Sequence, residues 1–112
     1  MITRDEAYEL LKRYNKEEFH LHHGRMVEGT MRYFAKKLGY GDEEEFWGIV
    51  GLLHDLDEET CDWRNDMSTH GPVSAEILKK EGFDDQVLCD AICAHNPPSG
   101  VVARTTLQYA VL

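Results

Sequence analysis

The sequence has little that would suit a secreted or membrane-embedded protein. Its 112 residues include only three cysteines, an odd number without the spacing of a disulfide framework. No apolar run approaches the roughly 20 residues that a membrane-spanning helix needs, and the first residues lack the hydrophobic segment of a signal peptide. We therefore expect a cytoplasmic protein with reduced thiols and no membrane partner. Cys89, Cys93 and His95 form only a weak zinc candidate, because no second pair completes the set.

Basic residues are also scarce. The chain has 12 Lys and Arg against 21 Asp and Glu, which gives a net charge of −9 at pH 7. Proteins that bind the phosphate backbone of nucleic acids need a basic face, and none is visible here. We expect no nucleic-acid partner, and a phosphorylated substrate would require a bound cation to offset the negative field.

Strand patterns, internal repeats and low-complexity segments are absent as well. Apolar residues instead recur at helical spacing, and 42% of the residues are hydrophobic, which is ordinary for a folded globular protein. The sequence therefore predicts an all-α fold, a compact bundle of five or six helices in a single domain over residues 1–112.

Capping residues and turn residues predict where these helices begin and end. Thr3 with Glu6, and Asp42 with Glu45, have the spacing of capping boxes. Ser68 or Thr69 is expected to cap the fourth helix, which has Pro72 in its first turn, and Asp84 or Asp85 the fifth. In the second helix, the expected inward residues are Val27, Met31, Phe34 and Leu38. The expected helices cover about 4–14, 18–38, 42–53, 69–81, 85–95 and 102–112.

Four histidines share one position in this pattern. His23, His54, His70 and His95 each extend the apolar stripe of a different helix by one turn. One such histidine is usually a hydrogen-bonded core residue, but four of them, with Asp55 next to His54, favour a metal site. Mixed imidazole and carboxylate ligands suit a divalent transition metal such as Mn, Fe, Ni, Co or Zn.

The polar, aperiodic residues 57–69 predict a long loop between the third and fourth helices. Loops of this length in compact domains are often functional, although a solvated linker is an equal alternative. Trp63 and Arg64 are its candidates for contact with a ligand.

The ordered histidines and their flanking residues resemble the HD-domain metal-dependent phosphohydrolases, above all the small stand-alone bacterial members. The resemblance extends from about His20 to Leu112. Its most specific segments are His23-Gly24-Arg25-Met26-Val27-Glu28, Gly51-Leu52-Leu53-His54-Asp55-Leu56-Asp57, His70-Gly71-Pro72 with Ala75-Glu76-Ile77-Leu78, and Ala94-His95-Asn96.

The resemblance implies roles for individual residues. His23, His54 and Asp55 would bind the primary metal, while His70 and His95 would hold a second metal or contact the phosphate. His20 matches no family role and would support the ligands. In catalysis, Asp55 would also orient the attacking water, and Asp57 or His70 would take a proton. The expected substrate-binding residues are Arg25, Arg64 and Asn96, with Lys36 as a further cation.

Two departures from the family pattern affect these expectations. That pattern closes with an aspartate on the last helix, whereas no acidic residue follows Asp90 here, and we expect Leu112 to lie inside that helix, a few residues short of the ligand. Phe19 stands where some two-metal branches carry a glutamate. We therefore expect weak metal retention, slow turnover or none, and an incompletely occupied second metal position.

Three functions remain open at this level. The first is a metal-dependent phosphohydrolase that acts on a small phosphate ester such as a nucleotide, by attack of a metal-activated water. The second is a metal-binding or regulatory module without turnover. The third is an HD-type di-iron oxygenase, which the resemblance also allows.

Overall fold

The computed structural model describes all 112 residues and contains helices but no strands. The predicted all-α fold is therefore confirmed, with six α-helices and three short 3₁₀ turns. The helices are α1 (Arg4–Tyr14), α2 (Glu18–Lys37), α3 (Glu44–Leu53), α4 (Pro72–Lys80), α5 (Gln86–Ala94) and α6 (Thr106–Val111). The 3₁₀ turns are η1 (Gly41–Glu43), η2 (Met67–Thr69) and η3 (Pro97–Ser99). None of the helices combines the length and the apolar character that crossing a membrane requires.

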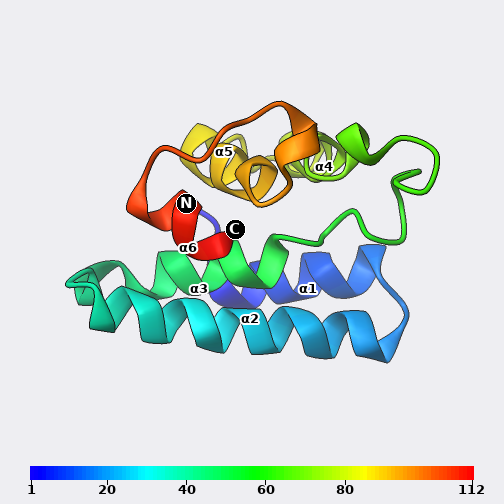
Figure 1. Cartoon of the computed structure of the whole chain (residues 1–112). Coiled ribbons are helices and arrows are strands. Elements are labelled where there is room, and N and C mark those ends of the chain that lie inside the picture. The colour runs from blue at the N-terminus through cyan, green and yellow to red at the C-terminus, as the bar shows by residue number, and fades with distance from the viewer.

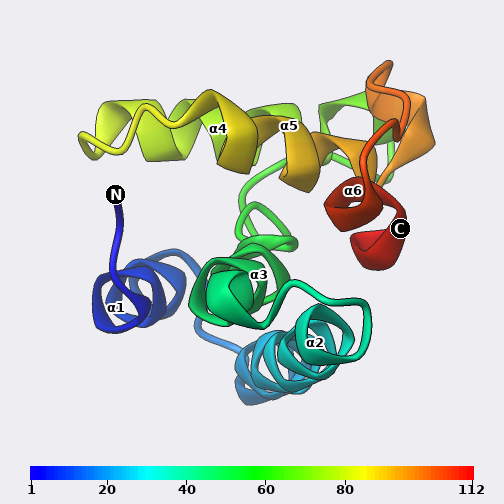
Figure 2. The same ribbon diagram turned by 90° about the vertical axis from the view of Figure 1, so that its left-hand side faces the viewer.

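The helices form two layers around α3. α1, α2 and α3 lie in one layer, α4 and α5 lie across it, and α6 packs at the side (Figures 1 and 2). α3 is central because seven of its ten residues are buried, from Trp47 to Leu53. A helix that is apolar on all sides is expected inside a domain, so α3 ends in the interior, and the polar residues that follow it begin there.

Glycines allow α2 and α3 to pack closely along their lengths. A Cβ atom on Gly51 of α3 would lie 2.6 Å from the carbonyl oxygen of Val27, and one on Gly24 of α2 would lie 3.1 Å from that of Leu52. The distance at position 51 leaves no room for a methyl group, so this position requires glycine, whereas a Cβ atom at position 24 would fit only if its neighbours moved by a few tenths of an ångström. The close packing places His23 of α2 beside His54, which directly follows α3.

The buried face of α2 is rotated from the one that the apolar pattern predicts. Met31 is buried as expected, but Leu38 is 50% exposed, so its predicted inward position is wrong. Glu28 lies in the buried face instead, because the guanidinium of Arg4 donates to both of its carboxylate oxygens, at 2.9 and 3.0 Å. A buried carboxylate paired in this way cannot be recognised from an apolar stripe.

Two of the predicted caps are confirmed. Thr3 and Glu6 form the capping box of α1, and Asp85 accepts hydrogen bonds from the first turn of α5. The predicted box of Asp42 and Glu45 is wrong, because η1 precedes α3 and no side chain caps it. The last helix begins at Thr106, four residues later than expected.

The predicted cap of α4 is also wrong, and this difference matters most for the site. Neither Ser68 nor Thr69 caps this helix; Gly71 precedes it with φ 112°. The backbone N–H groups of Gly71 and Ser74 donate instead to the carboxylate of Asp57, at 2.7 and 3.0 Å. A carboxylate at a helix N-terminus is favoured by the helix dipole, so Asp57 fixes the start of α4 from outside the helix.

The close packing of α2 on α3 can be tested with two glycine variants. Gly51→Ala forces a methyl group against the Val27 carbonyl and is expected to lower the free energy of unfolding by about 1–3 kcal/mol. Gly29→Ala is the control, because nothing lies within 4 Å of a Cβ there, and alanine within a helix should add about 0.5–1 kcal/mol. Urea denaturation measures both. Equal stability of Gly51→Ala and wild type would contradict the packing described.

Candidate metal centre

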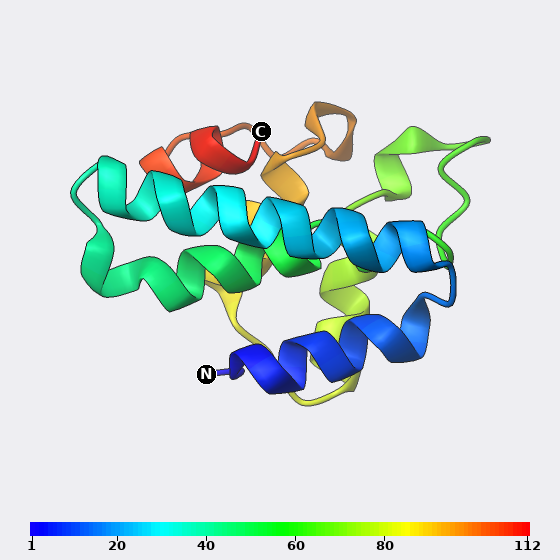
Figure 3. The ribbon, with the colours of Figure 1, turned by 90° about the horizontal axis from the view of Figure 1, so that it is seen from below.

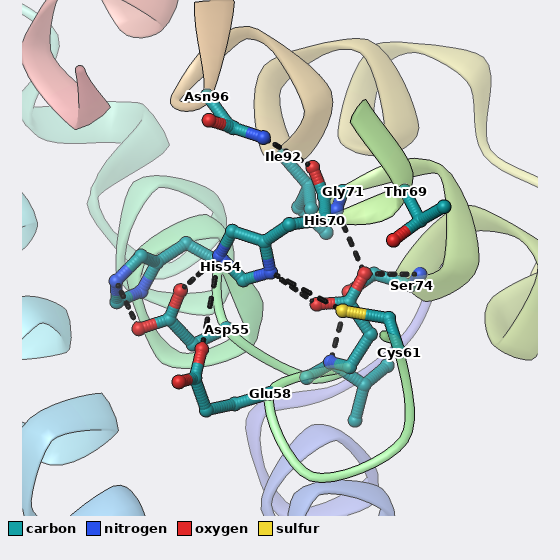
Figure 4. A network of polar contacts seen from close by, with 12 residues as sticks. His54, Asp55, Glu58, Cys61, Thr69, His70, Gly71, Ser74, Ile92 and Asn96 are labelled. Atoms are coloured by element: carbon teal, nitrogen blue, oxygen red, sulfur yellow. Dashed lines mark hydrogen bonds and ion pairs between the residues drawn. The ribbon is translucent and has the colours of Figure 1, made fainter. Parts of the chain in front are cut away.

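Five of the predicted site residues converge from four parts of the chain. His23 comes from α2, His54 and Asp55 follow α3, His70 precedes α4, and His95 follows α5. Each stands at a helix end or, for His23, in the first turns of α2, so the helices deliver these side chains to one point. Figure 4 shows His54, Asp55 and His70 at this point. His54 and His70 are buried, and Asp55 and His95 are half-buried.

The carboxylate of Asp55 lies between two groups of imidazoles. Its Oδ2 atom is 3.2 Å from Nε2 of His23 and 3.1 Å from Nε2 of His54. Its Oδ1 atom is 2.9 Å from Nε2 of His70 and 3.3 Å from Nε2 of His95. Within each group the two Nε2 atoms are 3.1 Å apart. One carboxylate therefore joins two three-residue clusters, each of a size that can hold a metal ion.

The other ring nitrogen of three histidines is already engaged. Nδ1 of His54 contacts the carbonyl oxygen of Gly51 at 2.6 Å, and Nδ1 of His95 contacts the carbonyl oxygen of Ile92. Nδ1 of His70 contacts Oδ1 of Asp57 at 2.6 Å. These oxygens only accept hydrogen bonds, so each Nδ1 must carry the proton, and in the neutral ring the Nε2 atom presents a lone pair.

The centre therefore brings hydrogen-bond acceptors face to face. Lone pairs of imidazole nitrogens and carboxylate oxygens around 3 Å apart repel one another unless a cation lies between them. The donor set of neutral imidazoles and a carboxylate, each imidazole oriented by a second hydrogen bond, fits a first-row divalent metal. α6 (Thr106–Val111) contains no acidic residue and adds no carboxylate to these two clusters.

Asp57 lies behind His70 and does not face the open side of the centre. It is fully buried and accepts hydrogen bonds from the ring of His70 and from two backbone amides. Burial alone would raise the pKa of Asp57, but these donors lower it below its usual range. The carboxylate is therefore ionised and holds the ring of His70 in place, whereas the family resemblance implied that it takes a proton.

His70 lies between two carboxylates, those of Asp55 and Asp57. Burial lowers the pKa of His70, but its hydrogen bonds to both carboxylates and their charges outweigh burial and raise the pKa to about 11. For Asp55, burial opposes ionisation, but hydrogen bonds to the surrounding histidines hold the pKa of its carboxyl far below the usual range. Without metal, a proton on Nε2 of His70 thus occupies one of the places where a cation is needed.

The three expected substrate-binding residues lie in different places. Asn96 is buried, and its amide donates to the carbonyl oxygens of Met67 and His70 at 2.8 and 2.9 Å. This fixes the backbone of His70. The guanidinium of Arg25 donates to Tyr8 and Glu18, and no contact brings it to the metal centre. The expected further cation, Lys36, pairs with Glu44 at 3.6 Å.

Arg64 lines a cavity of about 280 Å³ beside the centre. Its guanidinium lies over the ring of Trp63, 5.2 Å from the ring centroid. His20, which binds Glu59 at 2.7 Å and touches none of the five converging residues, forms part of the same wall. The cavity residues are Phe19, His20, Glu58, Cys61, Asp62, Trp63 and Arg64.

Glu58 is a candidate functional residue that the sequence did not reveal. One of its carboxylate oxygens lies 3.9 Å from Nε2 of His70, and the residue also lines the cavity. It is therefore the acidic side chain that connects the cavity with the metal centre. Its position three residues after Asp55, in the turn that continues α3, was the available signal.

Comparison with known protein families matches residues 20–108 to the HD domain. The chain therefore belongs to the HD-domain family. HD domains are typically metal-dependent phosphohydrolases and bind divalent metals, in agreement with the donor set described above. Neither the comparison with curated proteins nor that with solved structures gave a match.

Metal content is expected to depend on the residues that converge. Protein purified without chelator should carry a first-row metal, and His54→Ala and Asp55→Ala should each lower its content, because each variant removes an inward-facing ligand atom. His22→Ala is a suitable control, because His22 is exposed on α2. Elemental analysis gives the readout. Equal metal in wild type and in both ligand variants would exclude this centre.

Metal binding should also release a proton from His70. Since the pKa of this residue is raised to about 11, a metal that binds its Nε2 near neutral pH must displace the proton, and affinity should rise about tenfold per pH unit. Titration calorimetry in two buffers of different ionisation enthalpy measures the release, which His70→Ala should abolish. Identical heats in both buffers would contradict this account. In metal-free protein, the stability from protonated His70 is complete below about pH 6.5 and declines as the pH approaches the folded-state value.

Proposed function

We propose that this HD-domain protein is a metal-dependent phosphohydrolase that acts on a small phosphate ester such as a nucleotide. The observation that carries the proposal is the ring of acceptors around Asp55, which needs a cation and opens beside a cavity of about 280 Å³. Arg64 in that cavity supplies a positive charge for a phosphate. Family membership supports the same reaction class.

A divalent metal bound at this centre would lower the pKa of a water molecule and polarise a phosphoryl oxygen. The protein residues have separate tasks around it. Asp55 lies between the two groups of imidazoles and fixes their relative positions, and Asp57 fixes the ring of His70. Glu58 accepts the proton that water loses as it attacks phosphorus, because its carboxylate faces both the centre and the cavity. Arg64 orients the phosphate.

Activity on a panel of phosphate esters tests this proposal against its rivals. Purified protein with saturating Mn²⁺ should release inorganic phosphate from at least one ester, and Asp55→Ala should not, whereas His22→Ala should match wild type. Absence of phosphate release while metal is demonstrably bound would favour a binding or regulatory module. Oxygen consumption and an optical change that depend on iron would favour the oxygenase.

Glu58→Gln is the sharper test of the mechanism. Losing the general base is expected to lower kcat by about 10²–10⁴-fold, with little change in metal content, because Glu58 lies outside the five converging residues. Asp62→Asn is the matched control, since it removes the other carboxylate of the same cavity. Equal rates for Glu58→Gln and Asp62→Asn would remove Glu58 from the mechanism and leave the metal centre unaffected.

A further inference from the structure

His70 lies between two groups of side chains that can bind a metal, and only one of them belongs to the centre described above. On the Nε2 side of its ring are Asp55 and His95. On the Nδ1 side are the carboxylate of Asp57 and the thiol of Cys61. One ligand atom from each of these two residues and one ring nitrogen of His70 all lie within 4.8 Å of one another, close enough to hold a cation. We call Asp57, Cys61 and His70 the inner cluster.

A backbone turn brings Cys61 back onto Asp57. The N–H group of Cys61 donates to the carbonyl oxygen of Asp57 at 2.8 Å. Oδ1 of Asp57 is 2.6 Å from Nδ1 of His70, and Sγ of Cys61 is 3.9 Å from the same nitrogen (Figure 4). Oδ2 of Asp57 accepts from the backbone N–H groups of Gly71 and Ser74. The inner cluster therefore presents one oxygen, one sulfur and one nitrogen to a shared point.

The thiol distinguishes this donor set from the one around Asp55. Thiolate ligands select thiophilic cations such as Zn²⁺, whereas carboxylates also suit harder cations such as Mn²⁺. Zinc bonds of about 2.3 Å to sulfur and about 2.0 Å to nitrogen, at a tetrahedral angle, set these two atoms about 3.5 Å apart, close to the 3.9 Å between Cys61 and His70. Nδ1 of His70 and Oδ1 of Asp57, 2.6 Å apart, separate when a cation takes the place of the proton between them.

The inner cluster is buried but can be reached from the cavity. Asp57 is fully buried and His70 is 8% exposed. Cys61 is half-buried and lines the cavity of about 280 Å³. Its loop lies at one end of the molecule, beside the first turns of α2 (Figure 3). A cation that enters the cavity therefore meets the thiol first and finds the other two ligands behind it.

We propose that Asp57, Cys61 and His70 bind a thiophilic divalent cation, and that this cation withdraws His70 from the metal centre around Asp55. The cation replaces the proton of the Cys61 thiol and the proton on Nδ1, and His70 keeps a proton on Nε2. A neutral imidazole has one N–H group and one lone pair, so Nε2 then donates to Asp55 and offers no lone pair to a metal there. Inhibition of the proposed phosphohydrolase would follow, and this consequence alone rests on the proposed function.

Absorption spectroscopy with Cd²⁺ tests the ligands, because a thiolate bound to Cd²⁺ gives an ultraviolet charge-transfer band. One equivalent of Cd²⁺ should produce this band in wild type, and both Cys61→Ser and Cys61→Ala should abolish it. Cys89→Ser is the matched control and should retain the band, because Cys89 is a thiol of α5 outside the inner cluster. Circular dichroism verifies that each variant is folded. No band in wild type, or a band that survives the loss of the Cys61 thiol, would overturn the proposal.

Nuclear magnetic resonance of the histidine rings tests the withdrawal of His70. Long-range proton–nitrogen spectra show which ring nitrogen carries a proton and which binds a metal. With one equivalent of Cd²⁺, Nδ1 of His70 should bind the metal and Nε2 should carry the proton, whereas in Cys61→Ser Nδ1 should keep its proton. Wild type that binds Cd²⁺ while Nδ1 of His70 remains protonated would contradict the proposal. Both experiments are done without substrate, so their outcomes do not depend on the proposed phosphohydrolase activity.

Discussion

The carboxylate of Asp55 and the imidazole nitrogens around it form the interaction on which this structure depends. Four helix segments deliver histidines to one carboxylate, and the nitrogens and oxygens that meet there are acceptors at 2.9 to 3.3 Å. Buried polar groups are costly when left unpaired, so the arrangement is stable only with a cation, either protons or a metal. The packing of the helices therefore determines the geometry of the metal centre. The close contact of α2 with α3 at Gly24 and Gly51 is part of this packing.

Around this centre, the residues that position other side chains differ from those that would take part in the reaction. Asp57 and Asn96 do not face the cavity; one fixes the ring of His70 and the start of α4, the other fixes the backbone of His70. Hydrogen bonds of this kind set which ring nitrogen faces the metal. Glu58 and Arg64 instead line the cavity, where proton transfer and phosphate binding would take place. The same loop, residues 57–69, contributes to both tasks, which explains its length without regular helix.

The sequence predicts the fold better than it predicts the roles within the site. Helical periodicity placed four histidines at inward helix ends, and the structure brings His54, His70 and His95 together because those ends meet. The inward position predicted for His23 is wrong, because its side chain is 52% exposed, although its ring still reaches the Asp55 carboxylate. Periodicity does not show where a polar side chain finds its partner. The family resemblance implied that Asp57 or His70 takes a proton, yet the hydrogen bonds of Asp57 come from residues 70–74. Arg25 lies two residues after His23, but this offset turns it toward Tyr8 of α1. Only its position three residues after Asp55 distinguished Glu58 from the other acidic residues of its loop.

Anomalous diffraction from crystals grown with Mn²⁺ tests the central claim most directly, because it locates the cation. The account predicts a peak within bonding distance of the Asp55 carboxylate, on the side of His23 and His54, of His70 and His95, or on both sides, and no such peak after chelation. A peak only at Asp57 and Cys61, or no peak beside the Asp55 carboxylate in crystals grown with saturating Mn²⁺, would contradict it. In that case protons alone would hold the centre together, and the phosphohydrolase function would lose its structural basis.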